Sequence, residues 1–194
     1  MLGCHQEGSG VLLANDRSRS RLRSLRDVLA QHHISHAELS CRPGESFGGT
    51  HRDCFDRVLV DAPCSGEGML HSGDHAGWSQ WGLSRIRRLA RQQERLLLAG
   101  LRCLRPGGVL VYATCTYAPE ENESVLARVM AKLDMPAELE ALPVGLPEGY
   151  PGLSSWQEQA FDPCIGLARR MLPDDCCTGF FMARFRRHDE SESA

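Results

Sequence analysis

The sequence predicts an α/β fold with a parallel sheet, and two hydrophobic runs carry that prediction. Residues 58–60 (Val-Leu-Val) pass without interruption into a tight polar turn at 61–68 (Asp-Ala-Pro-Cys-Ser-Gly-Glu-Gly). Residues 107–113 run in the same way into the Thr-Cys-Thr loop at 114–116. Short apolar runs of this kind are typical of buried parallel strands. Because functional side chains gather at the carboxyl ends of such strands, we expect each strand to deliver one cysteine to the same edge of the sheet.

The N-terminal part is predicted to form a strand at 10–16, a helix at 17–31 and a short strand at 37–40. The helix is predicted from apolar residues at helical spacing. Asp16 ends the first strand and has two interpretations that can hold together. One is an acceptor for ribose hydroxyls, as in nucleotide-binding α/β folds, and the other is the N-cap of the following helix. Residues 42–49 are predicted to be a loop because they are rich in glycine and proline.

The middle of the chain is predicted to hold a polar loop at 71–81 and a long helix at 83–104. Trp78 and Trp81 in the loop either stack on bases or, as we favour, pack the loop onto the sheet. The helix has one apolar face, which suits a crossover between parallel strands. Its other faces carry arginines. We favour a solvated surface, and the more specific alternative is contacts to RNA phosphates. The arginines are Arg85, Arg87, Arg88, Arg91 and Arg95.

The C-terminal part is predicted to hold a helix, a loop and a hairpin. The helix at 120–133 follows Pro119 and begins with glutamates, and helix N-termini favour both proline and negative charge. Residues 135–159 are rich in proline and glycine without a clear period, so we predict a surface loop. Strands near 166–171 and 179–185 are expected to pair as an antiparallel hairpin.

Length and composition fit one such domain, followed by a disordered acidic tail at 187–194. The chain has 194 residues, 42% of them hydrophobic, which is enough for a sizeable core. It has no apolar run of about eighteen residues or more and no signal-peptide pattern, so we predict a cytoplasmic protein without a membrane segment. Nine scattered cysteines favour a reducing compartment. The net charge of −3 excludes a general attraction to nucleic acid, so RNA contact requires a local patch.

Two motifs and their order in the chain carry more information than either cysteine alone. The run at 61–68 is followed by Tyr-Ala-Thr-Cys-Thr-Tyr at 112–117 and by Pro-Glu-Glu-Asn-Glu at 119–123. Together they resemble the signatures of the RNA cytosine-C5 methyltransferases, the Sun/Nop family, and most of all the bacterial ribosomal RNA small-subunit methyltransferase F type. The resemblance extends from about Gly10 to about Arg186.

The resemblance implies a class I (Rossmann-like) sheet that binds S-adenosylmethionine and is closed by the C-terminal antiparallel hairpin. The family's first strand, its glycine-rich cofactor loop and an N-terminal RNA-binding region are expected to precede Met1. Residues 1–186 would then be a partial methyltransferase catalytic domain. Because the first strand is central in this fold, we expect the isolated chain to be less stable than a complete domain, or to pair with another chain along the exposed edge.

The resemblance also implies the residues that bind the cofactor. Asp16 is expected to accept hydrogen bonds from the ribose of S-adenosylmethionine, and the side chain of Asp61 is expected to contact the cofactor as well. Gapless alignment between these two positions puts Pro43 where relatives carry an aspartate on the adenine side. This sequence therefore departs from the family at that contact.

The catalytic residues implied by the resemblance are Cys115, Cys64 and Asp61. Carbon 5 of cytosine is a poor nucleophile, so a thiolate must first add to carbon 6. Cys115 is expected to be that nucleophile, Asp61 to hydrogen-bond the N3 and amino edge of the base, and Cys64 to be needed for release. Thr114 and Thr116 are expected to be hydroxyl partners in the loop. The expected RNA partner is ribosomal RNA first and transfer RNA second.

Two other hypotheses stay open beside the catalytic one. Taken singly, Cys64 and Cys115 would be interpreted as ordinary buried thiols, but their flanking residues on two matching strand ends favour the catalytic interpretation. A second hypothesis is a catalytically incompetent, Rossmann-like RNA-associated fragment or pseudoenzyme. A third is a cysteine-based redox or metal protein, although no metal site is predicted. Cys176 and Cys177 lack the spacing of zinc ligands, and the histidines at 32–36 have no second pair.

Overall fold

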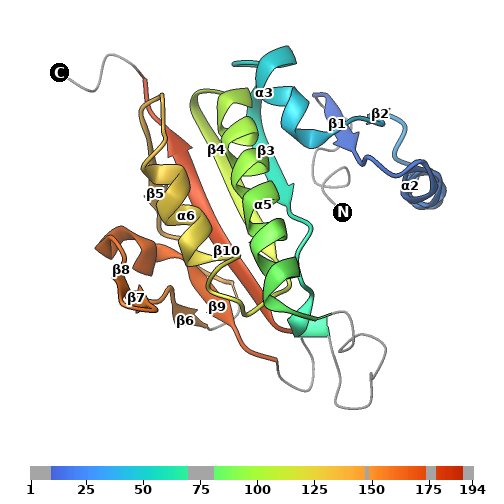
Figure 1. The fold of residues 1–194 in the computed structure, drawn as a ribbon. Coiled ribbons are helices and arrows are strands. Elements are labelled where there is room, and N and C mark those ends of the chain that lie inside the picture. The colour runs from blue at the N-terminus through green and yellow to red at the C-terminus, as the bar shows by residue number, and fades with distance from the viewer. Residues whose placement is uncertain (1–9, 70–80, 147–148, 174–177, 190–194) are drawn as a thin grey trace. The chain divides into compact units, whose positions relative to one another are not determined.

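The computed structural model describes residues 10–69, 81–146, 149–173 and 178–189. Figure 1 shows the elements, which divide into two compact units with the boundary after Phe47. Several predictions lie outside the described residues. These concern Trp78, the pair Cys176 and Cys177, and most of the acidic tail.

The N-terminal unit is a β–α–β arrangement. Strand β1 (Leu12–Asn15) pairs in parallel with β2 (Ala37–Ser40), and helix α2 (Arg19–Gln31) connects them. All three predicted elements are present. The predicted glycine- and proline-rich loop contains two short helical turns, η1 (Gly44–Ser46) and α3 (Phe47–Thr50), the second of which spans the boundary between the units.

The capping of α2 corrects one interpretation of Asp16. Ser18 is the N-cap residue, because its hydroxyl oxygen accepts a hydrogen bond from the backbone N–H of Arg21. Asp16 stands two residues earlier, and its Oδ1 accepts from the backbone N–H of Ser18 at 2.7 Å. The helix N-cap interpretation of Asp16 is therefore wrong, while its place at the end of β1 is as predicted.

The C-terminal unit is built on a six-stranded sheet. Its strands are β3 (Phe55–Asp61), β4 (Leu104–Thr114), β5 (Ala137–Glu140), β6 (Tyr150–Pro151), β9 (Arg169–Met171) and β10 (Phe180–Arg187). The order is β3-β4-β10-β9-β6, with β5 also paired to β10. β3 and β4 are parallel, whereas β10 is antiparallel to β4, β5 and β9. The predicted antiparallel C-terminal hairpin is thus confirmed.

Two helices, α5 (Leu83–Cys103) and α6 (Glu123–Met130), lie side by side over one face of this sheet in Figure 1. Alternate residues of β4 and β10 are buried in the core cluster, because successive side chains of a strand point to opposite faces. Gly100 lets α5 approach the sheet closely, since a Cβ there would lie 2.8 Å from Cδ1 of Leu110. The core residues on these two strands include Leu110, Tyr112, Phe181, Ala183 and Phe185.

Three elements differ from the prediction. The helix predicted at 120–133 begins only at Glu123. The predicted loop at 135–159 contains β5, where Leu139 is buried against the core, and also β7 (Ser155–Trp156), which pairs with β8 (Gln159–Ala160). At 135–159, pairing between strands overrides weak local sequence signals.

The third difference concerns β3, which was predicted to be buried. Within the described residues β3 pairs on one side only, with β4, and the side chain of Leu59 is 51% exposed. An apolar run shows that a strand forms, but not whether both of its edges are paired. In the part of the chain that the structure describes, no helix is long and apolar enough to cross a membrane.

Candidate active site

The carboxyl ends of β3 and β4 bring the two motif cysteines together. The strands pair in parallel with Asp61 opposite Ala113, so the loops that follow them start side by side. The Sγ atoms of Cys64 and Cys115 lie 3.0 Å apart, and the backbone N–H of Cys115 donates to Sγ of Cys64 at 3.3 Å. Both side chains are partly buried. The prediction that the two strands deliver their cysteines to one edge is therefore confirmed.

The contact between the thiols gives them different acidities. The hydrogen bond from Cys64 lowers the pKa of Cys115 to about 7, although burial and the carboxylates of Asp61 and Glu121 act in the opposite direction. The same bond, together with burial, raises the pKa of Cys64 well above its ordinary value of 9.0. The reactive thiolate of the pair is therefore on Cys115, and Cys64 keeps its proton.

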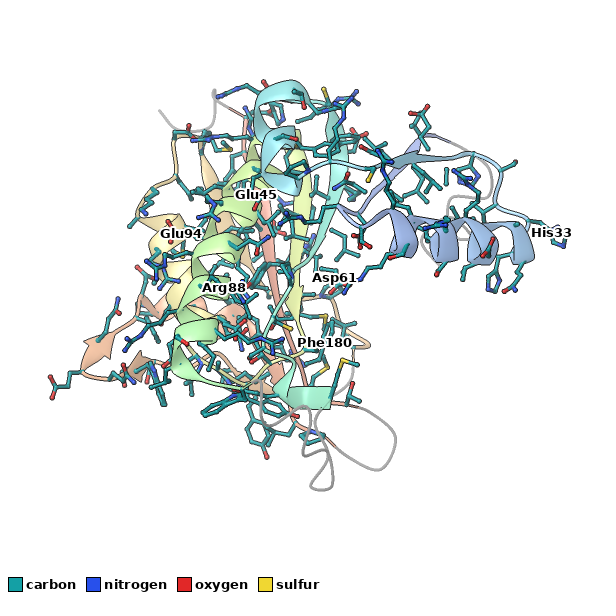
Figure 2. All side chains as sticks on the ribbon, turned by 45° about the vertical axis from the view of Figure 1, so that its right-hand side comes forward. His33, Glu45, Asp61, Arg88, Glu94 and Phe180 are labelled. Atoms are coloured by element: carbon teal, nitrogen blue, oxygen red, sulfur yellow. The ribbon has the colours of Figure 1, made fainter. Side chains whose placement is uncertain are left out.

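Asp61 ends β3 beside this pair. Figure 2 shows it at the same edge of the sheet as Phe180, the first residue of β10. Its side chain is exposed, and its carboxylate forms no hydrogen bond or ion pair with another described residue. An unpaired carboxylate next to a thiolate is available to accept hydrogen bonds from a bound molecule.

Side-chain hydrogen bonds join the two cysteine loops directly. The hydroxyl groups of Ser65 and Thr116 lie 2.7 Å apart. Oε2 of Glu67 accepts from the hydroxyl of Thr116 and from the backbone N–H of Tyr117, both at 3.1 Å. The expectation that Thr116 is a hydroxyl partner within the loop agrees with these contacts. Thr114 instead donates to Oδ1 of Asn122 at 2.7 Å.

A buried carboxylate, Glu121, holds the Cys64 loop together with Gln93 of α5. Its two oxygens accept from the backbone N–H of Ser65 at 3.1 and 3.2 Å, and Oε2 also accepts from Nε2 of Gln93 at 2.6 Å. Gln93 in turn donates to the carbonyl of Pro63 at 2.8 Å. Burial raises the pKa of Glu121 in spite of these hydrogen bonds. The backbone is therefore fixed on both sides of Cys64.

A buried ion pair holds the Cys115 loop. The carboxylate of Glu123 is fully buried and accepts two hydrogen bonds from Arg170, one from Nε and one from Nη2, each at 2.6 Å. Nη1 of Arg170 donates to the carbonyl of Tyr117 at 3.0 Å. Such a bidentate pair has a fixed geometry. It connects α6, β9 and the loop that follows Cys115.

These supporting residues were not identified as such from the sequence. The glutamates after Pro119 were interpreted as helix-start charges, whereas Glu121 and Glu123 are fully buried. A run of acidic residues directly after a strand-end motif was the available signal, because carboxylates that become buried need donors. The partners of Gln93 and Arg170 could not be predicted from neighbouring residues, since the two carboxylates are 28 and 47 residues away in the chain.

The N-terminal unit contains the other predicted cofactor residue. The side chain of Asp16 is 28% exposed, and its Oδ2 lies 3.6 Å from a guanidinium nitrogen of Arg21. Its oxygens retain lone pairs for a ribose hydroxyl. Pro43 has no polar side-chain atom and so offers no acceptor. Asp16 in this unit and Asp61 in the other unit are each carboxylates, and the hydroxyl and amino groups of S-adenosylmethionine need acceptors of this kind.

Trp81 lies at the end of the predicted polar loop and is 42% exposed. Its indole N–H donates to Glu67, which ties it to the Cys64 loop. Stacking of this side chain on a base stays a prediction. Among the described residues, no group of three or more histidine, cysteine, aspartate or glutamate side chains is placed to hold a metal ion.

The arrangement of strands and thiols defines the class of protein. NSun6 from Pyrococcus horikoshii, whose structure was solved with SFG, matches 97% of this chain with a TM-score of 0.77 and 27% identity, over 44% of its own length. A methyltransferase homolog protein from Pyrococcus horikoshii matches 93% of this chain with a TM-score of 0.76 and 33% identity, over 54% of its own length. The chain has the Rossmann-like fold of the S-adenosylmethionine-dependent methyltransferases.

The family follows from the sequence comparison. Residues 3–186 match the family described as 16S rRNA methyltransferase RsmB/F, and the chain belongs to this family. It is 34% identical over 184 residues to the tRNA (cytosine(49)-C(5))-methyltransferase of Pyrococcus abyssi, covering 94% of this chain and 58% of the relative. It is 35% identical over 187 residues to the ribosomal RNA small subunit methyltransferase F of Vibrio parahaemolyticus, covering 96% and 37%.

These matches confirm the resemblance predicted from the two motifs. The chain spans between 37% and 58% of the length of these two relatives.

Proposed function

We propose that the protein transfers a methyl group from S-adenosylmethionine to carbon 5 of a cytidine in structured RNA. Ribosomal RNA is the first candidate substrate and transfer RNA the second, since the matched relatives are named for these two substrates. The observation that carries the proposal is the pair of thiols 3.0 Å apart at adjoining strand ends, beside the unpaired carboxylate of Asp61.

Cys115 starts the chemistry. Its thiolate, available near neutral pH because its pKa is lowered to about 7, forms a bond to carbon 6 of cytosine. The electron pair of the carbon 5–carbon 6 double bond then becomes available at carbon 5. Asp61 accepts hydrogen bonds from the protonated N3 and the amino group, which favours addition of the thiolate. S-adenosylmethionine would supply the electrophilic methyl group, and Asp16 and Asp61 are the residues proposed to hold it.

Cys64 is assigned to release of the product. After methylation the thiolate of Cys64 takes the proton from carbon 5, the electron pair of that C–H bond re-forms the double bond, and the bond between Cys115 and carbon 6 breaks with its electrons returning to sulfur. Before the reaction, the bond to the Cys115 thiolate keeps Cys64 protonated. That acceptor is lost once Cys115 is bonded to carbon 6, so Cys64 gives up a proton more readily at the stage when release needs a second group.

Covalent trapping tests the two cysteine roles separately. RNA that contains 5-azacytidine should form a complex with the chain that survives denaturing electrophoresis, because the ring has no proton to lose at position 5. Cys115→Ala should abolish the complex. Cys64→Ala should retain it and should also accumulate a complex on ordinary RNA. An undiminished complex with Cys115→Ala would overturn the assignment of the nucleophile.

The exposed arginines of α5 are proposed to contact RNA phosphates. Arg87, Arg88, Arg91 and Arg95 are exposed, and none of them pairs with a carboxylate among the described residues. They extend along about 12 Å of the helix at 1.5 Å per residue. In this proposal the exposed face of α5 gives RNA a local positive surface despite the net charge of −3.

We expect the triple variant Arg87→Gln, Arg91→Gln and Arg95→Gln to bind RNA about tenfold more weakly. The slope of log affinity against log salt should become shallower by about 0.7 for each phosphate that an arginine no longer neutralises. Arg102→Gln is the matched control, since this residue lies on the same helix but its guanidinium is paired with Asp134 at 3.0 Å. An unchanged slope in the triple variant would mean that the arginines form only a solvated face.

Pro43 favours one alternative, an RNA-associated module without catalytic activity. The missing acceptor at this position weakens the expected adenine contact. Calorimetric titration of S-adenosylmethionine into the 194-residue chain separates the two functions. Binding at micromolar concentrations supports the methyltransferase, whereas a folded chain that shows no binding supports the module.

A further inference from the structure

Cys64 and Cys115 meet the main geometric requirement for a disulfide. Their Sγ atoms are 3.0 Å apart, and a disulfide bond is about 2.05 Å long. The sulfurs therefore need to approach by only about 1 Å. The two residues are 51 positions apart in the chain, yet the Ser65–Thr116 hydrogen bond already holds their loops together. Closure of the bond requires a local adjustment of these loops.

The chemistry of the pair also distinguishes it from two other described cysteines, Cys103 and Cys164. Burial raises the pKa of Cys103 to about 11 and that of Cys164 to about 12, so these thiols stay protonated. Cys115 instead has a neighbour that stabilises its thiolate, and it is only partly buried. Accessible thiolates react with oxidants to give sulfenic acids. A second thiol nearby then converts the sulfenic acid into a disulfide.

We propose that Cys64 and Cys115 form a reversible disulfide when the protein meets a hydroperoxide, which makes this pair a covalent modification site. Cys115 is then no longer a free nucleophile. That consequence for methyl transfer rests on the function proposed above, whereas formation of the disulfide does not.

The proposed step balances in atoms and electrons. The Cys115 thiolate attacks the outer oxygen of the hydroperoxide, the O–O bond breaks, and Cys115 becomes a sulfenic acid while the departing alkoxide or hydroxide takes up a proton. Sγ of Cys64 then displaces the sulfenic hydroxyl group. That hydroxide leaves as water with the proton of Cys64. Two thiols are oxidised to one disulfide, and the hydroperoxide is reduced to an alcohol and water.

The test uses hydrogen peroxide on the 194-residue chain without RNA or S-adenosylmethionine. We expect loss of two titratable thiols per chain and a cross-linked Cys64–Cys115 peptide in non-reducing mass spectrometry. Dithiothreitol should remove the cross-link and restore both thiols. Fragment spectra must assign the bond to Cys115, because tryptic digestion leaves Cys103 in the same peptide.

Two variants sharpen the result. In Cys64→Ala, Cys115 should pass to sulfinic acid, which dithiothreitol does not reduce, because no resolving thiol is present. Cys54→Ser, which removes an exposed thiol outside the pair, should cross-link as the unmodified chain does. Irreversible oxidation of Cys115 without a cross-link in the unmodified chain would overturn the proposal, and so would a Cys115 thiol that survives peroxide unchanged.

Methylation assays on the same samples keep this inference distinct from the proposed function. An active chain should lose activity with peroxide and regain it with dithiothreitol. A chain that cross-links but never methylates RNA would contradict the proposed function and leave the disulfide established.

Discussion

At the scale of single residues, the hydrogen bond between Cys64 and Cys115 determines at which pH Cys115 is reactive. Burial and the nearby carboxylates of Asp61 and Glu121 all favour the protonated thiol, and the bond from Cys64 outweighs them. A thiolate forms above the pKa, so the rate of any reaction at Cys115 should rise with pH through about 7. In the proposed reaction, Cys64 thus acts on the first step as well as on the release.

Alkylation by iodoacetamide should show this dependence. Followed by mass spectrometry of the peptide that contains Cys115, the alkylation rate of the unmodified chain should have a midpoint near pH 7. Cys64→Ala removes the stabilising donor, so the midpoint should move up toward or beyond the ordinary cysteine value of 9.0. A midpoint that does not move in this variant would show that another group stabilises the thiolate.

At the scale of elements, the Glu123–Arg170 pair holds α6 and β9 against the Cys115 loop. The carboxylate is fully buried, and its oxygens are taken up by Arg170 and by the backbone N–H of Leu153 at 3.0 Å. Removing one partner of a buried pair leaves the other charge uncompensated, which costs more free energy than the intact pair contributes. The pair therefore matters both to stability and to the position of the loop.

We expect Glu123→Gln to lower the free energy of unfolding by about 3–5 kcal/mol, because Arg170 then remains buried without its countercharge. Urea denaturation measures this change. Glu120→Gln serves as the control, since Glu120 makes an exposed hydrogen bond to the indole of Trp156 at 3.1 Å. The amide oxygen of this variant can still accept from the indole N–H, so the change should cost about 1 kcal/mol or less. Equal costs for the two variants would contradict the structural role of the ion pair.

At the scale of the whole molecule, the two units differ in how much they bury. The N-terminal unit has a two-stranded parallel sheet, and α2 contains no buried residue. A sheet of two strands is marginal by itself, whereas the six-stranded sheet carries a continuous apolar core. The free energy of local opening should therefore differ between the units.

Hydrogen exchange followed by mass spectrometry tests this expectation. Amides of β1 and β2 should exchange through openings that cost several kcal/mol less than those of β4 and β10. Denaturant added below the global transition should widen the difference. Equal protection in both sheets would show that the chain unfolds as one cooperative unit.

The sequence alone predicted β1 to β4, the C-terminal pair β9 and β10, and the family, but it did not predict β5 to β8. Apolar runs that end in polar turns predicted β3 and β4, and the two motifs with Cys64 and Cys115 identified the methyltransferase family, which the comparisons confirmed. These strands and motifs can be predicted from the sequence because they depend on residues that are adjacent in the chain. The two apolar runs also placed both cysteines at one edge, since adjacent parallel strands end together.

Which side chains support the site depends on contacts that form only when the chain folds. The 3.0 Å contact between the thiols, the bonds from Ser65 and Gln93 to Glu121, and the burial of the Glu123–Arg170 pair all join residues from different elements. Composition shows that carboxylates and donors are present but not which of them meet. Their pairing follows from how α5 and α6 pack on the sheet that contains β9, so the pKa of Cys115 is a property of the fold.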